Sequence, residues 1–520
     1  MYIETKEQNK SYVIELRESL SKNKYLKLES TYFNIDDGIT IYNFSKLYSN
    51  IPRGMTIANL INTDTPRVQD DTVCEQINTT NKTPTEKYND DNIEEIMDKQ
   101  GNVIKISQEL NTEQRKRALR LINNYKHLFT SDPLDIGCAK VEPCEIKLKT
   151  DKAIFQPPYR VSPAQRHKLR ILIEEMINAD IIEPSKSNYA APVFLVPKKE
   201  KGEYRFLVDY RKLNNETIPD KHPIPRSQDL FRSLEGAQYY SSIDMAQGYF
   251  QIPIKQEDQN KTGFITDFGL FNFKRIPQGF KNSAPIFQRI INNVFSDYLY
   301  RTMIAYLDDI CCFGTNFEEA LTNLKDIFSR LEEAGLKLKT NKCNFFSSNI
   351  ELLGHSVSNI GIKPLEKNIK AITSFPIPNK IKDVRAFIGL TSYYRKYINN
   401  FAKIANPLTS LTKKDNKFVW GKEQVEAFEI LKKAITTAPV LTHFEDGYPV
   451  FVTTDASLEG LSGILEQEDN NGKRHPIAYA SRKLKGGEKN YTTTELEMSA
   501  VVFATNHFRE YLLGRKITVF

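Results

Sequence analysis

The stretch Ala305-Tyr306-Leu307-Asp308-Asp309-Ile310-Cys311 decides how the rest of the sequence is interpreted. Apolar residues lie on both sides of the two acids, from Met303 before them to Phe313 after them. Two short apolar runs around a polar pair predict a β-hairpin with Asp308 and Asp309 at its tip. Adjacent carboxylates repel each other, and Mg²⁺ prefers carboxylate and phosphate oxygens, so the tip is a candidate cation site. The alternative is a solvated turn, in which Asp is common.

Composition sets wide limits on the class of protein. The chain has 520 residues, 40% of them hydrophobic and 26% charged, which predicts a globular protein of about three or four domains. The net charge of +7 fits a nucleic-acid partner without requiring one. The six cysteines form no CxxC pair and have no zinc-ligand spacing, which favours a reducing compartment. We therefore expect a cytoplasmic protein.

No membrane partner is expected, because no apolar run approaches the length of a membrane span. The N-terminal stretch is charged and has no apolar core segment, so no signal peptide is expected either.

The N-terminal part of the chain predicts little chemistry. Residues 1–63 are expected to form a small β-rich segment, with a hairpin turn at Asp36-Asp37-Gly38. Asp37-Gly38 is a poor match to an aspartic protease, because no hydroxyl residue follows Asp36 or Asp37 in the order that such enzymes need. Residues 64–109 are polar and are expected to form a linker.

Two helices and a strand pair follow. Apolar periodicity predicts a helix after Thr112, and Ser162-Pro163 is typical of the start of another helix. Residues 191–197 and 204–210 are then expected as strands around a basic turn at 198–202. Lys and Arg at such a tip are suited to binding phosphate, although a solvated edge turn is equally compatible with this hairpin taken alone.

A third acid, Asp244, is expected to lie near the hairpin that carries Asp308 and Asp309. Residues 239–244 predict a strand that ends in Asp244, and residues 284–299 predict a helix before the hairpin. A strand ending in Asp, a helix and a hairpin carrying Asp308 and Asp309 can bring three carboxylates together in one sheet.

Six motifs in this order resemble the reverse transcriptase of gypsy-type long-terminal-repeat retrotransposons. They are Leu-Val-Pro-Lys-Lys (195–199), Tyr-Arg-Phe-Leu-Val-Asp-Tyr-Arg-Lys-Leu-Asn (204–214), Ser-Ile-Asp-Met-Ala-Gln-Gly-Tyr-Phe-Gln-Ile (242–252), Ile-Pro-Gln-Gly-Phe (276–280), Tyr-Leu-Asp-Asp-Ile (306–310) and Leu-Leu-Gly-His (352–355). The resemblance continues from about residue 110 to the last residue. On this resemblance, residues 1–63 correspond to a remnant of the spacer between a protease and the polymerase.

The resemblance implies an α+β right-hand polymerase fold. The fingers and palm would occupy residues 110–317, the thumb 318–375, the connection 376–446 and an RNase H-like domain 447–520. The implied activity is RNA-directed DNA synthesis, with an RNA or DNA template, a primer and deoxynucleoside triphosphates as partners. A homo-oligomer and a location within virus-like particles are further expectations from the resemblance.

The resemblance also implies roles for single residues. Asp244, Asp308 and Asp309 would form the catalytic triad that binds two Mg²⁺ ions, with Mn²⁺ as an alternative. The residues implied for nucleotide binding are Lys198, Lys199, Arg205, Tyr249 and Gln278. Tyr249 would block a ribose 2′-hydroxyl, and its alternative role is that of a core aromatic. Gly354 and His355 would contact the primer, although a lone histidine is more often structural.

In the RNase H-like region, Asp455 and Glu497 are the candidate metal ligands. Glu495 competes with Glu497, but Thr492-Thr493-Thr494-Glu495 forms a capping box, which gives Glu495 a structural role. Glu497 shares a helical face with Ala500, Val501 and Ala504.

The chain ends at Phe520, where the family continues into a strand with a third acid, so we expect an unpaired sheet edge there and little or no RNase H activity.

Two other functions compete with this reading of the sequence. A relic that only binds nucleic acid would not need to keep Asp244, Asp308 and Asp309. A polymerase that makes RNA would be disfavoured by Tyr249.

Overall fold

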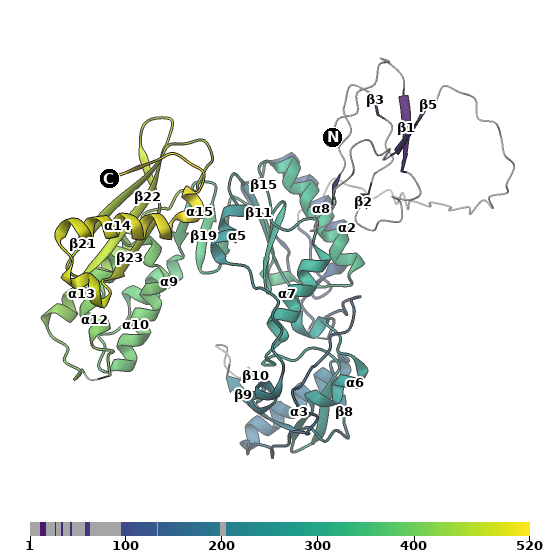
Figure 1. Cartoon of the computed structure of the whole chain (residues 1–520). Coiled ribbons are helices and arrows are strands. Elements are labelled where there is room, and N and C mark those ends of the chain that lie inside the picture. Colours follow the sequence, from purple (N-terminus) through teal and green to yellow (C-terminus); the bar gives the residue numbers. More distant parts are fainter. Residues whose placement is uncertain are drawn as a thin grey trace. The chain divides into compact units, whose positions relative to one another are not determined.

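The computed structural model describes residues 95–132, 134–197, 204–414 and 416–520, and the backbone of five short strands before them (Figure 1). The chain divides into two compact units, Met1–Tyr88 and Asn89–Phe520. The strands of the first unit are β1 (Ser11–Leu16), β2 (Leu26–Lys27), β3 (Phe33–Asn34), β4 (Tyr42–Asn43) and β5 (Ala58–Asn62). β1 pairs with β3 and β5, whereas β4 pairs with β2. The hairpin turn expected at 36–38 lies outside the described residues.

The central sheet of the second unit has the strand order β14-β15-β11-β17-β6. Its strands are β14 (Met303–Tyr306), β15 (Asp309–Gly314), β11 (Tyr239–Asp244), β17 (Asn344–Ser347) and β6 (Lys105–Ile106). β15 runs antiparallel to both β14 and β11. Helices α7 (Ser283–Val294) and α8 (Phe317–Glu333) pack against this sheet, and α2 (Thr112–Asn124) packs against α8. The sheet is the expected palm, and α8 lies against β11 and β15.

Two expected boundaries are wrong at this sheet. Residues 318–347 were expected in the thumb, but α8 covers the central sheet and β17 is one of its strands. Residues 64–109 were expected as a linker, but β6 pairs in parallel with β17 at the end of that range. Apolar periodicity predicts which face of a helix or strand is buried, but not which sheet that face packs against. The sequence pattern alone therefore assigned α8 and β6 to the wrong regions.

The expected fingers form a second sheet, in the order β10-β9-β12-β13-β8. Its strands are β10 (Tyr204–Val208), β9 (Ala191–Pro197), β12 (Phe264–Thr266), β13 (Gly269–Phe273) and β8 (Ile182–Pro184). Helix α3 (Pro163–Asn178) packs against β8 and β10, and it begins at the predicted Ser162 cap. One continuous apolar core runs through both sheets and their helices.

A helical layer follows the central sheet. It contains a three-stranded sheet, β18 (Asn349–Leu352), β19 (His355–Ser358) and β20 (Gly361–Pro364). Its main helices are α9 (Glu366–Thr373), α10 (Ile381–Tyr393), α11 (Phe401–Ile404), α12 (Asn406–Ser410) and α13 (Lys422–Thr436). These elements share a second core with α5 (Ser227–Ser233). The expected boundary between thumb and connection at residue 375 is therefore not a break in packing, because Ile372 and Val384 lie in the same core.

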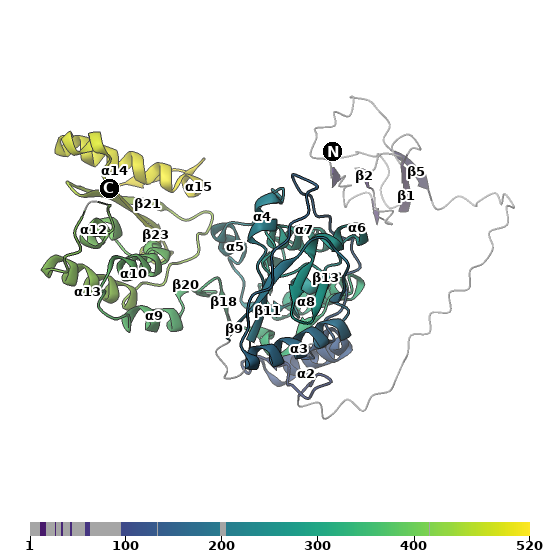
Figure 2. The same cartoon turned by 90° about the horizontal axis from the view of Figure 1, so that it is seen from below.

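The C-terminal sheet has the order β23-β22-β21-β24. Its strands are β21 (Val450–Ser457), β22 (Gly460–Glu468), β23 (Arg474–Lys483) and β24 (Ile517–Val519), and α14 (Thr493–His507) covers one face (Figure 2). Gly463 permits this packing, because a Cβ there would lie 2.7 Å from the Ala504 Cβ. β24 pairs in parallel with Val450–Val452, so the edge that was expected to be unpaired is partly covered.

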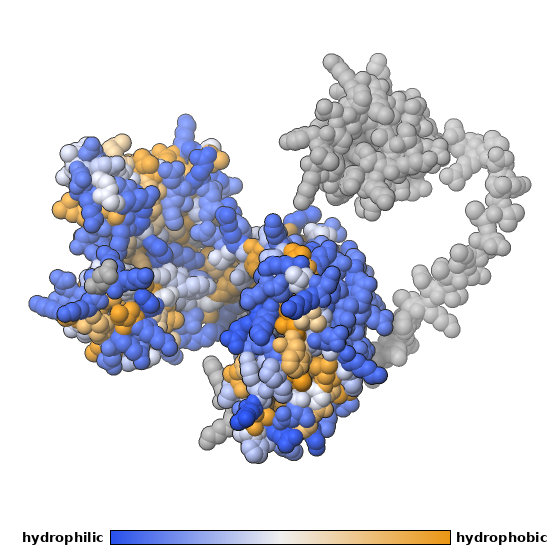
Figure 3. Space-filling model, turned by 60° about the horizontal axis from the view of Figure 1, so that its bottom comes forward, coloured by the Kyte–Doolittle hydropathy of each residue, from blue (hydrophilic) through white to orange (hydrophobic). Residues whose placement is uncertain are grey.

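The surface drawn in Figure 3 is mainly hydrophilic, with apolar residues in separate patches. No helix in the described ranges is both long enough and apolar enough to span a bilayer.

Candidate active site

The three acids of the palm meet at one end of the central sheet. Asp244 is the last residue of β11 and lies directly opposite Asp309, the first residue of β15. Asp308 occupies the turn between β14 and β15, where Tyr306 pairs with Asp309. The predicted hairpin with two acids at its tip is confirmed, and the strand register brings Asp244 to it.

A buried amide braces the turn of this hairpin. Leu307 has the left-handed backbone conformation, with φ of 52°, which is costly for a residue with a side chain. Its N–H donates to Gln288 Oε1 at 2.7 Å, and Gln288 Nε2 donates to the carbonyl of Ala305 at 3.2 Å. Gln288 is fully buried on α7. Sequence reasoning missed this residue, although a glutamine on the apolar face of a helix was a usable signal.

The carboxylate of Asp308 is poorly satisfied. Its Oδ1 atom is buried, and no hydrogen-bond donor in the described residues reaches it. Burial, followed by the charges of Asp244 and Asp309, raises the pKa of Asp308 to about 6. Loss of hydration within the pocket and the charge of Asp244 also raise the pKa of Asp309. A buried acid without a donor is a place where a cation would be stabilising.

Gly248 keeps the space beside Asp308 open. A Cβ atom at this position would lie 3.2 Å from Asp308 Oδ1 and 3.0 Å from the ring of Phe287. Both contacts are tight, so a side chain there would displace either the carboxylate or the ring.

The three carboxylates are suitable ligands for a hard divalent cation, but their oxygen atoms are not gathered around one position. Asp244 Oδ2 pairs instead with Lys342 Nζ at 2.9 Å. In the part of the chain that the structure describes, no group of three or more His, Cys, Asp or Glu side chains is arranged to hold a metal ion. Carboxylate oxygens and the unpartnered Asp308 Oδ1 are suitable ligands, and Lys342 neutralises part of their charge.

A pocket of about 830 Å³ contains the three acids and several expected nucleotide-binding residues. Arg205, Tyr249 and Gln278 line it, whereas Lys198 and Lys199 lie outside the described residues. The ring of Tyr249 packs edge-on against Phe287, with centroids 5.3 Å apart, and burial and then Asp308 raise its pKa to about 12. Tyr249 is therefore both a packing residue and part of the pocket wall. The pocket also includes Lys339 and Lys342, which sequence reasoning missed.

The two residues expected to contact the primer, Gly354 and His355, make contacts within the chain. His355 is only 3% exposed, and its Nδ1 lies 2.7 Å from the carbonyl of Leu353. Burial, with a smaller effect of Lys396, lowers the pKa of His355 to about 3, so the ring is neutral. The side chain of His355 is therefore a buried packing residue, and its expected primer contact stays a prediction. The carbonyl of Gly354 accepts a hydrogen bond from the Tyr394 hydroxyl at 2.7 Å.

Both candidate acids of the C-terminal region are exposed. Asp455 lies on β21 and Glu497 lies on α14, which packs against that sheet. Asn400 Nδ2 donates to Asp455 Oδ2 at 3.3 Å. The predicted capping box is confirmed, because Thr492 N–H donates to Glu495 Oε2 at 2.7 Å.

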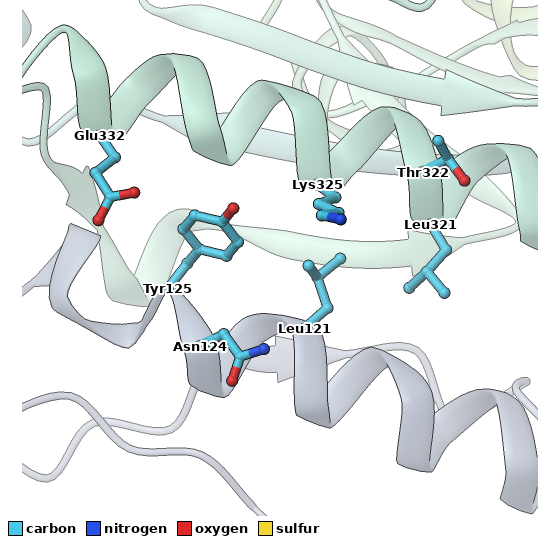
Figure 4. Close-up of a pocket in the computed structure, with 7 residues that line it drawn as sticks. All are labelled: Leu121, Asn124, Tyr125, Leu321, Thr322, Lys325 and Glu332. Atoms are coloured by element: carbon cyan, nitrogen blue, oxygen red, sulfur yellow. The ribbon is translucent and has the colours of Figure 1, made fainter. Parts of the chain in front are cut away.

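A separate hollow of about 530 Å³ lies between α2 and α8 (Figure 4). The residues that line it are Leu121, Asn124, Tyr125, Leu321, Thr322, Lys325 and Glu332. Glu332, its one acid, pairs with His127 at 2.8 Å. No cluster of reactive groups lies in this hollow, unlike the pocket of the palm.

Comparison with known proteins agrees with this architecture. Residues 196–357 match the family described as reverse transcriptase (RNA-dependent DNA polymerase), and residues 420–519 match the RNase H-like domain found in reverse transcriptase. The retrovirus-related Pol polyprotein from transposon 297 of Drosophila melanogaster is 39% identical over 417 residues, which are 79% of this chain and 39% of that protein. The chain spans about two fifths of the length of the curated relatives that it matches first.

Solved structures give the same result. The foamy viral protease-reverse transcriptase dRH in complex with double-stranded DNA is similar, with a TM-score of 0.72 and 25% identity, over 79% of this chain and 72% of that one. The foamy viral protease-reverse transcriptase in complex with an RNA/DNA hybrid matches with a TM-score of 0.69 and 25% identity, over 79% of this chain and 55% of that one. The fold is therefore that of a right-hand polymerase with a C-terminal RNase H-like region, and the chain belongs to the reverse transcriptase and RNase H region of long-terminal-repeat retrotransposon Pol polyproteins.

Proposed function

We propose that the chain is an RNA-directed DNA polymerase that extends a primer at Asp244, Asp308 and Asp309. The main support is the partly buried Asp308 carboxylate, which lies beside two further acids and has a buried, unpartnered oxygen. Such an arrangement is unfavourable for stability unless a cation neutralises it. The foamy viral relatives with bound double-stranded DNA and RNA/DNA hybrid support a template–primer duplex as the substrate.

Asp244 and Asp308 would be the main ligands of two Mg²⁺ ions, with Asp309 a looser ligand. Bound Mg²⁺ supplies the charge that activates a primer 3′-hydroxyl and stabilises the triphosphate during in-line displacement. Asp244 would exchange its partner Lys342 for this charge. Gln288 and Gly248 help to position the Asp308 carboxylate. Gln288 fixes the turn that carries it, and Gly248 leaves room beside it.

The pocket wall would select and hold the nucleotide. Arg205 is exposed at the pocket and can bind phosphate oxygens with its guanidinium. Lys198 and Lys199 remain proposed partners of the same phosphates, and Gln278 would orient the nucleotide. Tyr249 would exclude a ribose 2′-hydroxyl, because its ring is held in place by Phe287.

The experiment is primer extension by the purified chain on a homopolymer RNA template with Mg²⁺. Extension is expected from the wild-type chain and is expected to be abolished by Asp308→Asn, which keeps the shape of the side chain and removes its charge. Extension that persists in Asp308→Asn would defeat the proposal.

Choice of sugar is tested separately. Tyr249→Ala is expected to raise the incorporation of ribonucleotides relative to deoxyribonucleotides, because it removes the ring from the pocket wall. Unchanged selectivity in this variant would leave Tyr249 as a packing residue only.

The RNase H-like domain has its own proposed ligands, Asp455 and Glu497. The support is their place on β21 and on the helix that covers it. Degradation of the RNA strand of a labelled hybrid, lost on Asp455→Asn, would show that this pair is active.

A further inference from the structure

The turn between β18 and β19 has a strained backbone. Leu352 pairs with His355, so the loop consists of only two residues, Leu353 and Gly354. Both have positive φ, 45° and 72° respectively. Glycine accepts this conformation, but leucine does so at a cost that the surrounding structure must offset.

Side chains of the helical layer hold this turn. The hydroxyl of Tyr393 donates to the carbonyl of Leu353 at 2.5 Å, and the hydroxyl of Tyr394 donates to the carbonyl of Gly354 at 2.7 Å. Asn368 Nδ2 donates in turn to the Tyr394 hydroxyl at 2.6 Å. The Gly354 carbonyl also accepts two longer bonds, from the Leu365 N–H at 3.3 Å and from Asn368 Nδ2 at 3.5 Å, so the bond from Tyr394 is the shortest of three. Both carbonyls of the loop are therefore bound by neighbouring tyrosines at the end of α10, and a residue of α9 supports one of them.

One of the residues that hold the turn, Tyr393, lies near the hairpin of acids. Leu353 and Tyr306 pack against the same apolar core, and Tyr306 is the strand partner of Asp309. Tyr306 also lines the pocket that contains the three acids. Burial raises the pKa of Tyr393, and the nearby hydroxyls of Tyr394 and Tyr306 add to this effect. Tyr393, which donates to the turn, thus lies near Tyr306, a residue of the pocket wall on the strand that leads to Asp308.

We propose that Tyr394, assisted by Tyr393 and Asn368, is a positioning residue for nucleotide addition. Its hydroxyl fixes the Leu353–Gly354 turn to the helical layer, so that the wall beside Tyr306 keeps one position relative to Asp308. The catalytic part of this inference rests on the proposed polymerase function. The competing explanation is that the tyrosines only fill space around His355, whose ring packs against Tyr393, Tyr394 and Tyr397.

Tyr397 provides a matched control for that explanation. It belongs to the same aromatic cluster and is 2% exposed, and no partner in the described residues reaches its hydroxyl. Tyr397→Phe therefore removes a hydroxyl from the cluster without removing a bond to the turn. Tyr394→Phe removes the same atom together with the bond to Gly354.

The first measurement is the single-turnover rate of nucleotide addition to a primer annealed to homopolymer RNA. Tyr394→Phe is expected to lower this rate about tenfold or more, with the nucleotide concentration at half-maximal rate changed less than about twofold. Tyr393→Phe is expected to have a smaller effect, because Tyr393 is 51% exposed and water can replace its bond. Tyr397→Phe is expected to keep the wild-type rate. Equal loss in Tyr394→Phe and Tyr397→Phe would overturn the proposal in favour of packing.

The second measurement does not depend on activity. Amide hydrogen exchange in peptides that cover residues 350–358 is expected to become faster in Tyr394→Phe and to stay unchanged in Tyr397→Phe. Unchanged exchange in Tyr394→Phe would overturn the proposed hold on the turn. A wild-type chain that extends no primer would instead overturn the proposed function and the catalytic part of this inference, while the exchange experiment still decides whether the tyrosines hold the turn.

Discussion

The acids of the palm and the acids of the C-terminal sheet lie in contrasting surroundings. Asp308 is partly buried, has an unpartnered oxygen and lies in a turn that Gln288 braces. Asp455 and Glu497 are exposed to water, and Asp455 is contacted by Asn400 at 3.3 Å. The palm holds its charges in an arrangement that is unfavourable in the absence of a cation, whereas water can solvate the charges of the other sheet. The difference indicates that the palm is organised for chemistry before a substrate arrives.

The largest expected effect tests this comparison directly. Asp244→Asn is expected to lower primer extension by about a thousandfold or more, because it removes one of the two proposed main cation ligands. Asp455→Asn is expected to change extension by less than about twofold, since it lies in the other sheet. Both rates come from the same assay on homopolymer RNA. A comparable loss in the two variants would mean that the sheets do not act separately.

Two buried glutamines allow a finer test. Gln288 braces the acid hairpin, and Gln467 makes the same kind of two-bond contact with the backbone of Glu445 in the C-terminal region. Gln288→Leu is expected to lower the extension rate by about 30-fold to 100-fold, because the turn that carries Asp308 loses both bonds. Gln467→Leu removes an equivalent pair of bonds and is expected to leave the extension rate nearly unchanged. Equal rates in the two variants would contradict the bracing role.

Asp98 shows what a buried acid looks like when it is satisfied. It is 8% exposed and accepts hydrogen bonds from the backbone N–H groups of Gln100 and Asn102 and from the Ser131 hydroxyl. Burial opposes its ionisation, but the hydrogen bonds outweigh burial and lower its pKa to about 2.

Asp98→Asn is therefore expected to reduce local stability by about 2 kcal/mol at neutral pH, while extension is largely kept. The stabilisation by Asp98 is present above its unfolded pKa and is lost as the pH falls through its folded pKa of about 2. Amide exchange in residues 95–106 measures this, and the difference between variant and wild type should shrink between about pH 4 and pH 2. A difference that does not depend on pH would contradict the assignment.

The smallest expected effect lies in the C-terminal region. Thr492→Ala removes the N-terminal cap of α14 and is expected to cost about 1 kcal/mol of helix stability. Glu497→Ala, in the exposed part of the same helix, is expected to leave stability unchanged. Thermal unfolding and amide exchange in the first turn of α14 compare the two. A larger loss for Glu497→Ala would show that this acid has a structural partner.

Local patterns in the sequence predicted most of the elements and the meeting of the acids. The hairpin at Asp308, the strand that ends at Asp244 and the cap at Ser162 are confirmed, because each depends on residues close in the chain. The helix expected at 284–299 ends earlier, at Val294.

Features that depend on contacts between residues far apart in the chain could not be predicted from local sequence patterns. The role of Gln288 depends on a turn about 20 residues away, and the burial of His355 depends on helices that follow it. The sheet to which α8 belongs was likewise decided by tertiary packing.

The strand β6 has a practical consequence for anyone who trims this chain. It lies at the outer edge of the central sheet and closes that edge by pairing with β17. A fragment that begins at Thr112 would keep every acid of the pocket but would uncover the backbone donors and acceptors of Asn344 and Phe345. An open strand edge recruits other chains, so such a fragment is expected to self-associate.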